Sequence, residues 1–286
     1  MFYKAIGVTI IAAALLTACG AKPEAGHTEH NAVTKTEKNV DATNKSHEQH
    51  EDHGNSTDFK IVTDWKLSVE KPQPNQDVKL SIQISDDKGG KIEKFDVSHE
   101  KQMHLIVVNK DLSYFDHIHP DYKGAGLFEI STKFPKNGEF KLIADFIPSG
   151  GKQKTESHWI QVGDKTELAA ITLDKSLTTV VDGKEITLSF NKLEAGKDIE
   201  MKFAFKDSSS KQPITNLQPY LGAVGHVVII SSDVEQYIHN HPLEEKATGP
   251  DAKFATSFPK SGVYKIWGQF QQNGKLFVVP FVINVP

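Results

Sequence analysis

A long internal repeat constrains the fold of this chain more than any other feature. A segment rich in histidine occurs twice, and its second copy lies 122 positions after the first. The first copy carries His104, Asp111, His117, His119 and Pro120, and the second carries His226, Asp233, His239, His241 and Pro242. The match continues upstream (77–84 with 198–205) and downstream (134–141 with 258–265) with small changes of offset. The chain therefore contains two copies of one domain.

Each copy has the pattern of a small all-β domain. Short stretches rich in Val, Ile and Phe alternate with polar residues, and clusters of Gly, Pro, Asn and Asp separate them. About seven such stretches per copy, without a long helical period, predict an immunoglobulin-like β-sandwich. We expect one sandwich over residues 58–163 and a second over 165–286. The short join at Gly163 predicts two domains that pack or hinge closely.

The N-terminal segment 1–19 is typical of a signal peptide. A single lysine precedes an apolar run of twelve residues, which is too short to span a bilayer. The run ends in Leu16-Thr17-Ala18-Cys19-Gly20, which resembles the lipobox of bacterial lipoproteins and implies that Cys19 is lipidated after cleavage. We therefore expect the protein outside the cytoplasm, anchored by acyl chains to the cell membrane. A plain secretory peptide, with Cys19 incidental, is the alternative.

Residues 20–57 are predicted to be a disordered tether. They contain no aromatic residue, Leu or Ile, and so cannot bury enough apolar surface to fold. The tether carries two histidine clusters beside carboxylates, which predict weak metal capture: His27, His30, His47, His50 and His53. The alternative is a soluble spacer that happens to contain histidine.

The repeated segment predicts a β-hairpin that gathers three imidazoles. If Lys110 and Asp111 are the central turn residues, His104 lies opposite His117 with Cβ atoms about 5 Å apart. His119, two residues further on, points to the same face. Neutral imidazoles suit copper and zinc, and three of them leave one coordination position open. We predict a first metal site from His104, His117 and His119, and a second from His226, His239 and His241.

The first copy offers further candidate ligands, and a structural alternative remains. Near its hairpin it has His99, Met103 and His158, where the second copy has Leu221, Gly225 and Pro280. These three residues are additional candidates for a copper or zinc site. Alternatively, the paired His-X-His-Pro motifs could be structural, because duplication copies structural and functional residues alike. In that case their imidazoles would donate hydrogen bonds to loop carbonyls.

Composition excludes several other functions. The chain has one cysteine, Cys19, so the mature domains have neither disulfides nor thiolate metal sites. The net charge is −4, and every basic residue is lysine, which argues against nucleic-acid recognition because arginine is the usual reader of phosphate and guanine. No nucleophile elbow, phosphate loop or general-base carboxylate accompanies the histidines. We therefore expect a non-enzymatic protein.

The hairpin, the Phe134-Pro135 corner and the stretch 144–151 resemble bacterial exported proteins with YtkA-like or FixH-like sandwich domains, and more loosely the CopC-type periplasmic copper carriers. The resemblance implies an immunoglobulin-like sandwich that handles copper or another heavy metal. The chain lacks the Met-rich loop of CopC-type carriers, since Met103 and Met201 are its only methionines after Met1. We expect a protein that buffers, delivers or detoxifies copper or zinc. The alternative is an interaction module for another envelope protein.

Overall fold

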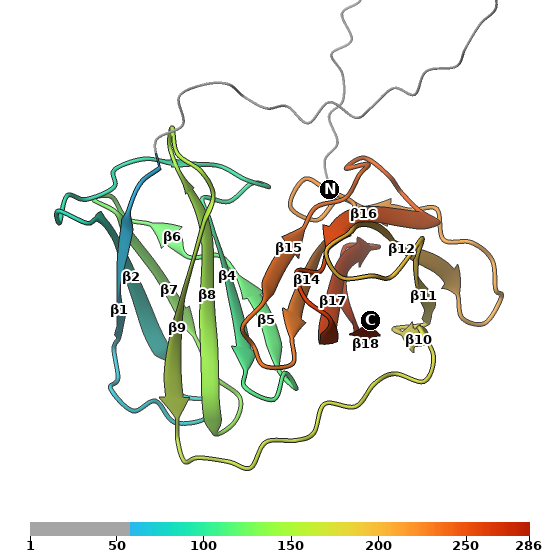
Figure 1. Cartoon of the computed structure of the whole chain (residues 1–286), viewed down its shortest axis with the longest axis horizontal. Coiled ribbons are helices and arrows are strands. Elements are labelled where there is room, and N and C mark those ends of the chain that lie inside the picture. The colour runs from blue at the N-terminus through green and yellow to red at the C-terminus, as the bar shows by residue number, and fades with distance from the viewer. Residues whose placement is uncertain (1–57) are drawn as a thin grey trace, which may run out of the picture. The chain divides into compact units, whose positions relative to one another are not determined.

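The computed structural model describes residues 58–286, and all regular structure in this range is β-strand. The predicted all-β class with two tandem sandwiches is confirmed (Figure 1). The signal segment with Cys19 and the tether with its five histidines lie outside the described residues. Among the residues described, no helix has the length and apolar character needed to cross a membrane.

The first sandwich consists of two sheets around one core. The first sheet has the order β1-β2-β7-β6, formed by β1 (Ile61–Leu67), β2 (Val78–Asp86), β7 (Leu127–Thr132) and β6 (Asp121–Tyr122). The second has the order β3-β8-β4-β5, with β9 also paired to β8: β3 (Phe95–Asp96), β8 (Gly138–Pro148), β4 (Met103–Asn109), β5 (Phe115–Ile118) and β9 (Lys154–Val162). On β2 alternate residues are buried, so one face of the strand lies on the core as its period of two predicts.

The second sandwich repeats this plan with the same number of strands in each sheet. Its first sheet has the order β10-β11-β12-β16: β10 (Thr178–Val181), β11 (Lys184–Phe190), β12 (Asp198–Asp207) and β16 (Asp251–Ser257). Its second sheet has the order β13-β17-β14-β15, with β18 also paired to β17: β13 (Leu217–Gln218), β17 (Gly262–Gln272), β14 (Gly225–Ser231), β15 (Tyr237–Asn240) and β18 (Lys275–Val285).

The second sheets of the two sandwiches pack against each other. Every residue of β4 and of β14 is buried, because one face of each strand lies on its own core and the other on the opposite sandwich. A separate apolar cluster, the interface cluster, joins the outer faces: Ile106, Val108, Leu112, Ile143, Val228, Ile230, Val234 and Trp267. The ring of Phe115 stacks on Trp267 across the contact at 4.8 Å. This contact sets the environment of the histidines that follow in the same strands.

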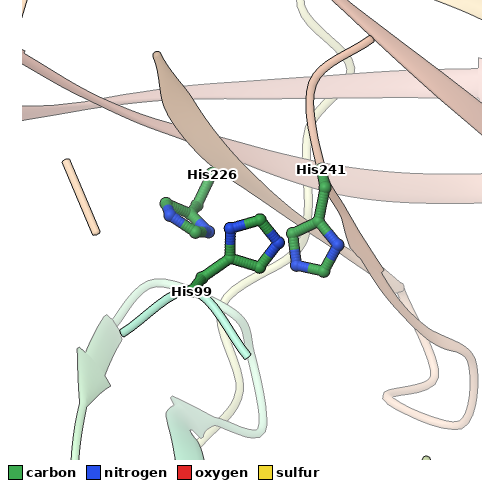
Figure 2. Close-up of side chains that lie close together, drawn as sticks. All are labelled: His99, His226 and His241. Atoms are coloured by element: carbon green, nitrogen blue, oxygen red, sulfur yellow. The ribbon is translucent and has the colours of Figure 1, made fainter. Parts of the chain in front are cut away.

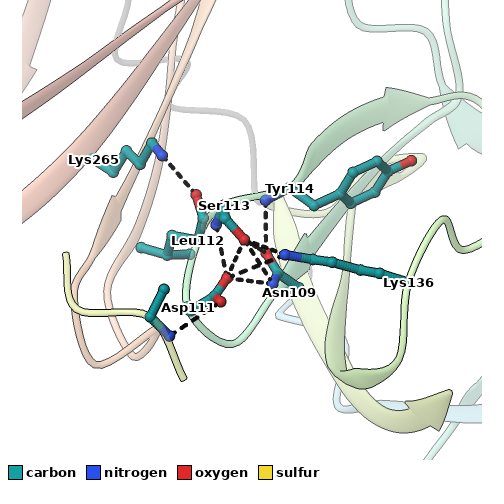
Figure 3. Close-up of polar contacts among 8 residues, drawn as sticks. Asn109, Asp111, Leu112, Ser113, Tyr114, Lys136 and Lys265 are labelled. Carbon is teal, nitrogen blue, oxygen red and sulfur yellow. Dashed lines mark hydrogen bonds and ion pairs between the residues drawn. The ribbon is translucent and has the colours of Figure 1, made fainter. Parts of the chain in front are cut away.

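The contact is reciprocal at its loops as well. Lys141 Nζ donates to the carbonyl of Val234 at 2.6 Å, and its counterpart Lys265 donates to the carbonyl of Leu112 at 2.8 Å (Figure 3). Leu112 and Val234 both adopt left-handed backbone conformations, with φ of 54° and 62°. Such angles are uncommon for any residue other than glycine, and they are least favourable for the β-branched Val234. Each is held because its side chain fills the interface cluster while its carbonyl accepts a lysine from the other sandwich.

The loop of the first hairpin explains why its register differs from the prediction. Ile106 pairs with His117, so His104 lies across from His119 and the predicted register was wrong by two residues. Lys110 and Asp111 do form a backbone turn, in which the Leu112 N–H donates to the Asn109 carbonyl at 2.8 Å, but the loop continues to Tyr114. Side chains hold this longer loop: Asn109 Oδ1 accepts the Tyr114 N–H, and the Asp111 carboxylate accepts the Ser113 N–H (Figure 3). Because the shift is an even number, every histidine keeps its predicted face.

The segment between the sandwiches is longer than the sequence suggested. Residues 163–177 contain no strand, and the first strand of the second sandwich begins only at Thr178. The segment is tied to both sandwiches: the Ala169 N–H approaches Asp111 Oδ2 at 3.4 Å, and Asp174 exchanges two hydrogen bonds with the backbone of Val282. Ile171 packs on the interface cluster. The segment therefore lines the contact between the two sandwiches.

We predict that Lys141→Met lowers the free energy of unfolding by about 1–3 kcal/mol, because the Val234 carbonyl loses its donor in a buried place. Urea denaturation would measure the change. The control is Lys275→Met, which removes an exposed ion pair with Asp182 and should change stability by less than about 0.5 kcal/mol. Equal effects of the two substitutions would contradict the prediction.

Candidate metal centre

Seven imidazoles converge where the two sandwiches meet. The seven are His99, His104, His117, His119, His226, His239 and His241. Ring centroids of neighbouring members lie between 3.8 and 6.2 Å apart. The hairpin histidines share the outer face of their sheets with the interface cluster, so sheet packing brings both sets together. The two sites predicted separately thus form one continuous histidine cluster.

The three histidines predicted for the first site lie close together. His104, His117 and His119 each offer a nitrogen within 4.8 Å of the other two. Their ring centroids are 4.7–5.1 Å apart. The side chains of His104 and His117 are almost inaccessible, with residues 3 % and 6 % exposed. Three nitrogens on a rigid sheet, shielded from water, are suited to holding one metal ion.

The second site differs in membership from the prediction. His226 and His241 converge with His99 of the first sandwich, again with one nitrogen each within 4.8 Å (Figure 2). The His99 ring stacks on His241 at 3.8 Å and meets His226 edge-on at 5.1 Å. His239, predicted for this group, is not one of the three, although its register is equivalent to that of His117; its Nδ1 instead contacts Asp145 of the first sandwich. The second group therefore combines imidazoles from both domains.

Two reciprocal hydrogen bonds cross between the sandwiches. His239 Nδ1 donates to Asp145 Oδ2 at 3.2 Å, and its counterpart His117 donates from Nδ1 to Gln269 Oε1 at 2.6 Å. Asp145 and Gln269 occupy equivalent places, each paired with the first histidine of its hairpin. The side chains of His239 and Asp145 are 2 % and 3 % exposed, and Gln153 donates to both oxygens of Asp145. Only one half of the cluster thus contains a carboxylate.

Backbone carbonyls fix the tautomers of two further rings. His104 Nε2 donates to the Ser98 carbonyl at 3.0 Å, and His226 Nε2 donates to the Tyr220 carbonyl at 3.0 Å. Since a carbonyl can only accept, the proton of each neutral ring is on Nε2, and Nδ1 carries the lone pair. In metal sites of other proteins, a hydrogen bond of this kind from the outer ring nitrogen to a carbonyl orients the histidine that binds the metal.

The lone pairs of the cluster are not satisfied within residues 58–286. His104 Nδ1 faces His117 Nε2 at 2.9 Å, although the outer partner of each ring leaves a lone pair on both of these atoms. Four more buried ring nitrogens have no hydrogen-bond partner among the described residues: His119 Nε2, His226 Nδ1, His239 Nε2 and His241 Nε2. Buried polar atoms are rarely left unpaired. An electron-pair acceptor placed among these atoms would satisfy them.

Burial keeps the rings neutral. It lowers the pKa of His104 to about 4 and that of His226 to about 2, with the neighbouring His239 acting in the same direction. Burial likewise lowers the pKa of His119 and of His241 to about 3, and it lowers the pKa of His99 and of His117. At neutral pH each of these rings is neutral and has one nitrogen with a free lone pair, which is the form that binds a metal ion.

A small cavity gives access to the cluster. It has a volume of about 10 Å³, close to that occupied by one water-sized sphere. Its lining includes His104, His239 and His241 together with Asp145 and Gln153. The cavity therefore lies beside imidazoles of both hairpins and beside the carboxylate that orients one of them.

Two other candidate ligands lie away from the cluster. Met103 is completely buried in the core of the first sandwich, on the face of β4 opposite to His104. His158 lies on β9, where its ring stacks on Trp65 at 5.7 Å. No thioether therefore lies among the imidazoles, as far as residues 58–286 are concerned.

Sequence reasoning missed the polar residues that cross the interface. Asp145, Gln269 and Gln153 lie far from the hairpins in the chain, and nothing in the motifs connects them to histidine. One signal was available: Leu105–Val108 and Val227–Ile230 are uninterrupted apolar runs, which indicate strands buried on both faces. Those runs predict a partner surface over each hairpin.

Comparison with protein families identifies the repeat. A family described as "Domain of unknown function (DUF8832)" matches residues 62–164 and again 178–286. The chain belongs to this family. The two matches coincide with the two sandwiches and omit most of the connecting segment. The resemblance to YtkA-like, FixH-like and CopC-type proteins stays a prediction. A comparison with curated proteins found no match.

Solved structures similar to this chain include two bacterial adhesins and a fibronectin type-III segment. The Escherichia coli adhesin FdeC is 16 % identical, with 78 % of this chain and 64 % of that chain covered and a TM-score of 0.27. The Yersinia pseudotuberculosis adhesin InvE is 9 % identical (79 % and 61 % covered, TM-score 0.25), and a segment of two fibronectin type-III domains from chicken tenascin is 10 % identical (80 % and 99 %, TM-score 0.22). The chain spans less than two thirds of either adhesin chain. At this level of similarity the comparisons carry no argument about function.

We predict that the protein loses stability as the pH falls below about 6.5. An imidazole whose pKa is lower in the folded chain binds fewer protons there than in the unfolded chain. Acidification below the unfolded pKa of about 6.5 therefore favours the unfolded chain and lowers the free energy of unfolding. Each such histidine contributes up to about 1.4 kcal/mol per pH unit. The urea midpoint should fall between pH 7 and pH 5, above the range in which most carboxylates titrate.

His226→Asn should make this pH dependence shallower, whereas His158→Asn, outside the cluster, should leave it unchanged. A midpoint that stays constant from pH 7 to pH 5 would refute the prediction.

Proposed function

We propose that this protein binds copper or zinc ions at the histidine cluster between its two sandwiches. One observation carries the proposal: lone pairs of buried, neutral imidazoles point at one another without a donor, most clearly His104 Nδ1 and His117 Nε2 at 2.9 Å. Two neutral lone pairs at this distance repel each other. A shared cation removes the repulsion, and a separation of about 3 Å is normal for two nitrogens on one ion with metal–nitrogen distances of about 2.0–2.1 Å.

The set of donors selects the class of metal. Imidazole suits zinc, copper and nickel, while hard ions such as Mg²⁺ and Ca²⁺ prefer oxygen ligands. The methionines of the described range, Met103 and Met201, are buried in the sandwich cores and cannot supply a soft thioether ligand for Cu(I). We therefore propose Cu(II) or Zn(II) as the bound ion, held first by His104, His117 and His119.

The surroundings of the cluster favour binding over catalysis. The nearest carboxylate, Asp145, accepts hydrogen bonds from His239 and Gln153 and so acts as an orienting group. The cavity beside it holds about one water-sized sphere, too little for an organic substrate. Three protein ligands leave a position through which an ion can be exchanged. These features support buffering or delivery of the metal.

We place this activity in the bacterial cell envelope. The lipobox at Cys19 supports a lipid anchor on the outer face of the membrane, and the five tether histidines would capture metal near the domains. The partners proposed are the membrane, the metal ion and a second envelope protein that donates or accepts it.

A metal titration tests the proposal. The test chain begins at residue 19, carries Cys19→Ser, and has its five tether histidines replaced by asparagine so that only the domains can bind. We expect calorimetry to show tight Zn(II) and Cu(II) binding. His104→Asn/His119→Asn should weaken binding at this site at least tenfold, because it loses two of its three ligands. His158→Asn is the control. If the test chain binds neither ion, the histidines are structural and an interaction module becomes the better interpretation.

The carboxylate gives an independent prediction. Asp145→Asn keeps the size of the side chain but removes the charge that orients His239. Loss of such an outer-shell partner typically lowers metal affinity by about 10–100-fold. Competition with a chelator of known affinity would measure the change, with the exposed Asp121→Asn as control. Unchanged affinity would mean that His239 is not part of the metal centre.

A further inference from the structure

We propose that His99, His226 and His241 form a second metal site that spans the two sandwiches, so that an ion bound there clamps the domains together. This inference rests on the proposed function and extends it to a second ion with a different role. His99 comes from the loop between β3 and β4, while His226 and His241 come from β14 and from the residue after β15 (Figure 2). The first site, by contrast, draws all three ligands from one sandwich.

The second copy of the domain shows the equivalent loop with a leucine, Leu221, in place of His99. The loops 98–101 and 220–223 have the same shape: Ser98 and Lys101 form a bridge, as do Tyr220 and Ala223, and the first residue of each loop accepts a hydrogen bond from the hairpin histidine. His99 and its counterpart Leu221 share a left-handed conformation, with φ of 47° and 50°. Since leucine occupies this conformation equally well, the loop does not require an imidazole.

The two loops also lie against each other. A Cβ added at Gly222 would be 3.5 Å from Glu100 Oε1, so loop 98–101 reaches the second sandwich directly beside His99. The His99 ring is half-buried against His241, at 3.8 Å with an angle of 30° between the planes. His99 therefore approaches the opposite hairpin more closely than any histidine of the first hairpin does.

The nitrogens of this site are available for coordination. His226 is 0 % exposed, and its Nδ1 has no partner among residues 58–286, because its proton lies on Nε2 and is donated to Tyr220. His241 Nε2 likewise lacks a partner there. Without an ion, an isolated buried lone pair costs free energy because it has no hydrogen-bond partner. With an ion, the same lone pair becomes a ligand.

A bound ion would strengthen the contact between domains by linkage. Its ligands from both sandwiches are brought together only when the interface cluster is closed, so it binds the closed arrangement in preference to the open one. At a concentration one hundred times its dissociation constant, such an ion shifts the equilibrium towards the closed form by roughly a hundredfold. The interface is thereby made sensitive to the metal concentration outside the cell.

The test compares His99→Leu with the unchanged site. Both are made in the chain that begins at residue 19, carries Cys19→Ser and has its five tether histidines replaced by asparagine. Spin labels on Val62→Cys and Val180→Cys, exposed by 52 % and 56 % on β1 and β10, report the distance between the sandwiches. Zinc alone is the probe, and its stoichiometry is measured by calorimetry in parallel. His158→Leu is the matched control, since it also replaces an imidazole by leucine but lies outside the cluster.

With the site intact, we expect two zinc ions per chain and a narrower distance distribution when zinc is added. His99→Leu should bind one ion and lose the narrowing, while His158→Leu should behave like the parent. If His99→Leu binds as many ions as the parent, or still shows the narrowing, the clamp is refuted while the proposed metal-binding function stands. If the parent binds no zinc, the clamp is refuted; if it binds no Cu(II) either, the proposed function fails with it.

Discussion

The structure depends on the apolar contact between the outer faces of two sheets. Ile106, Val108 and Ile143 meet Val228, Ile230 and Trp267, and this packing removes the neighbouring histidines from water. A single sandwich would leave its hairpin imidazoles on an exposed face, free to bind protons and water. Closure by a second copy lowers their pKa values and leaves their lone pairs facing one another. The hydrophobic contact thus creates the chemistry of the cluster, although none of its members takes part in it.

Many features at this interface occur twice, once in each sandwich. The lysine-to-carbonyl bonds cross it in both directions, and the left-handed loop residues and the histidine-to-carbonyl bonds within each sandwich also have counterparts. The exceptions are therefore informative. Asp145 faces a histidine where Gln269 stands in the other half, and His99 replaces Leu221. The first departure adds a carboxylate to the histidine cluster and the second adds an imidazole.

The repeat, the all-β class and the convergence of the three histidines on the first hairpin could be predicted from spacing alone, because strand periodicity fixes which side chains share a face. The register of the hairpin could not, since Asn109 and Asp111 shape its loop through side-chain hydrogen bonds. The merging of two sites into one cluster was also beyond reach. It depends on how two outer faces pack, and the only trace of this in the sequence is the pair of uninterrupted apolar runs.

The reciprocity of the interface has the form of an isologous contact, in which residue i touches j and the equivalent of j touches the equivalent of i. Such contacts are typical of homodimers with two-fold symmetry, yet here both halves belong to one polypeptide. In a homodimer, any substitution appears twice and keeps the two halves identical. The covalent segment 163–177 removes that restriction, so a carboxylate or an extra imidazole can be gained on one side only. Joining the copies is what allows one pseudo-symmetric cluster to contain two unequal groups of histidines.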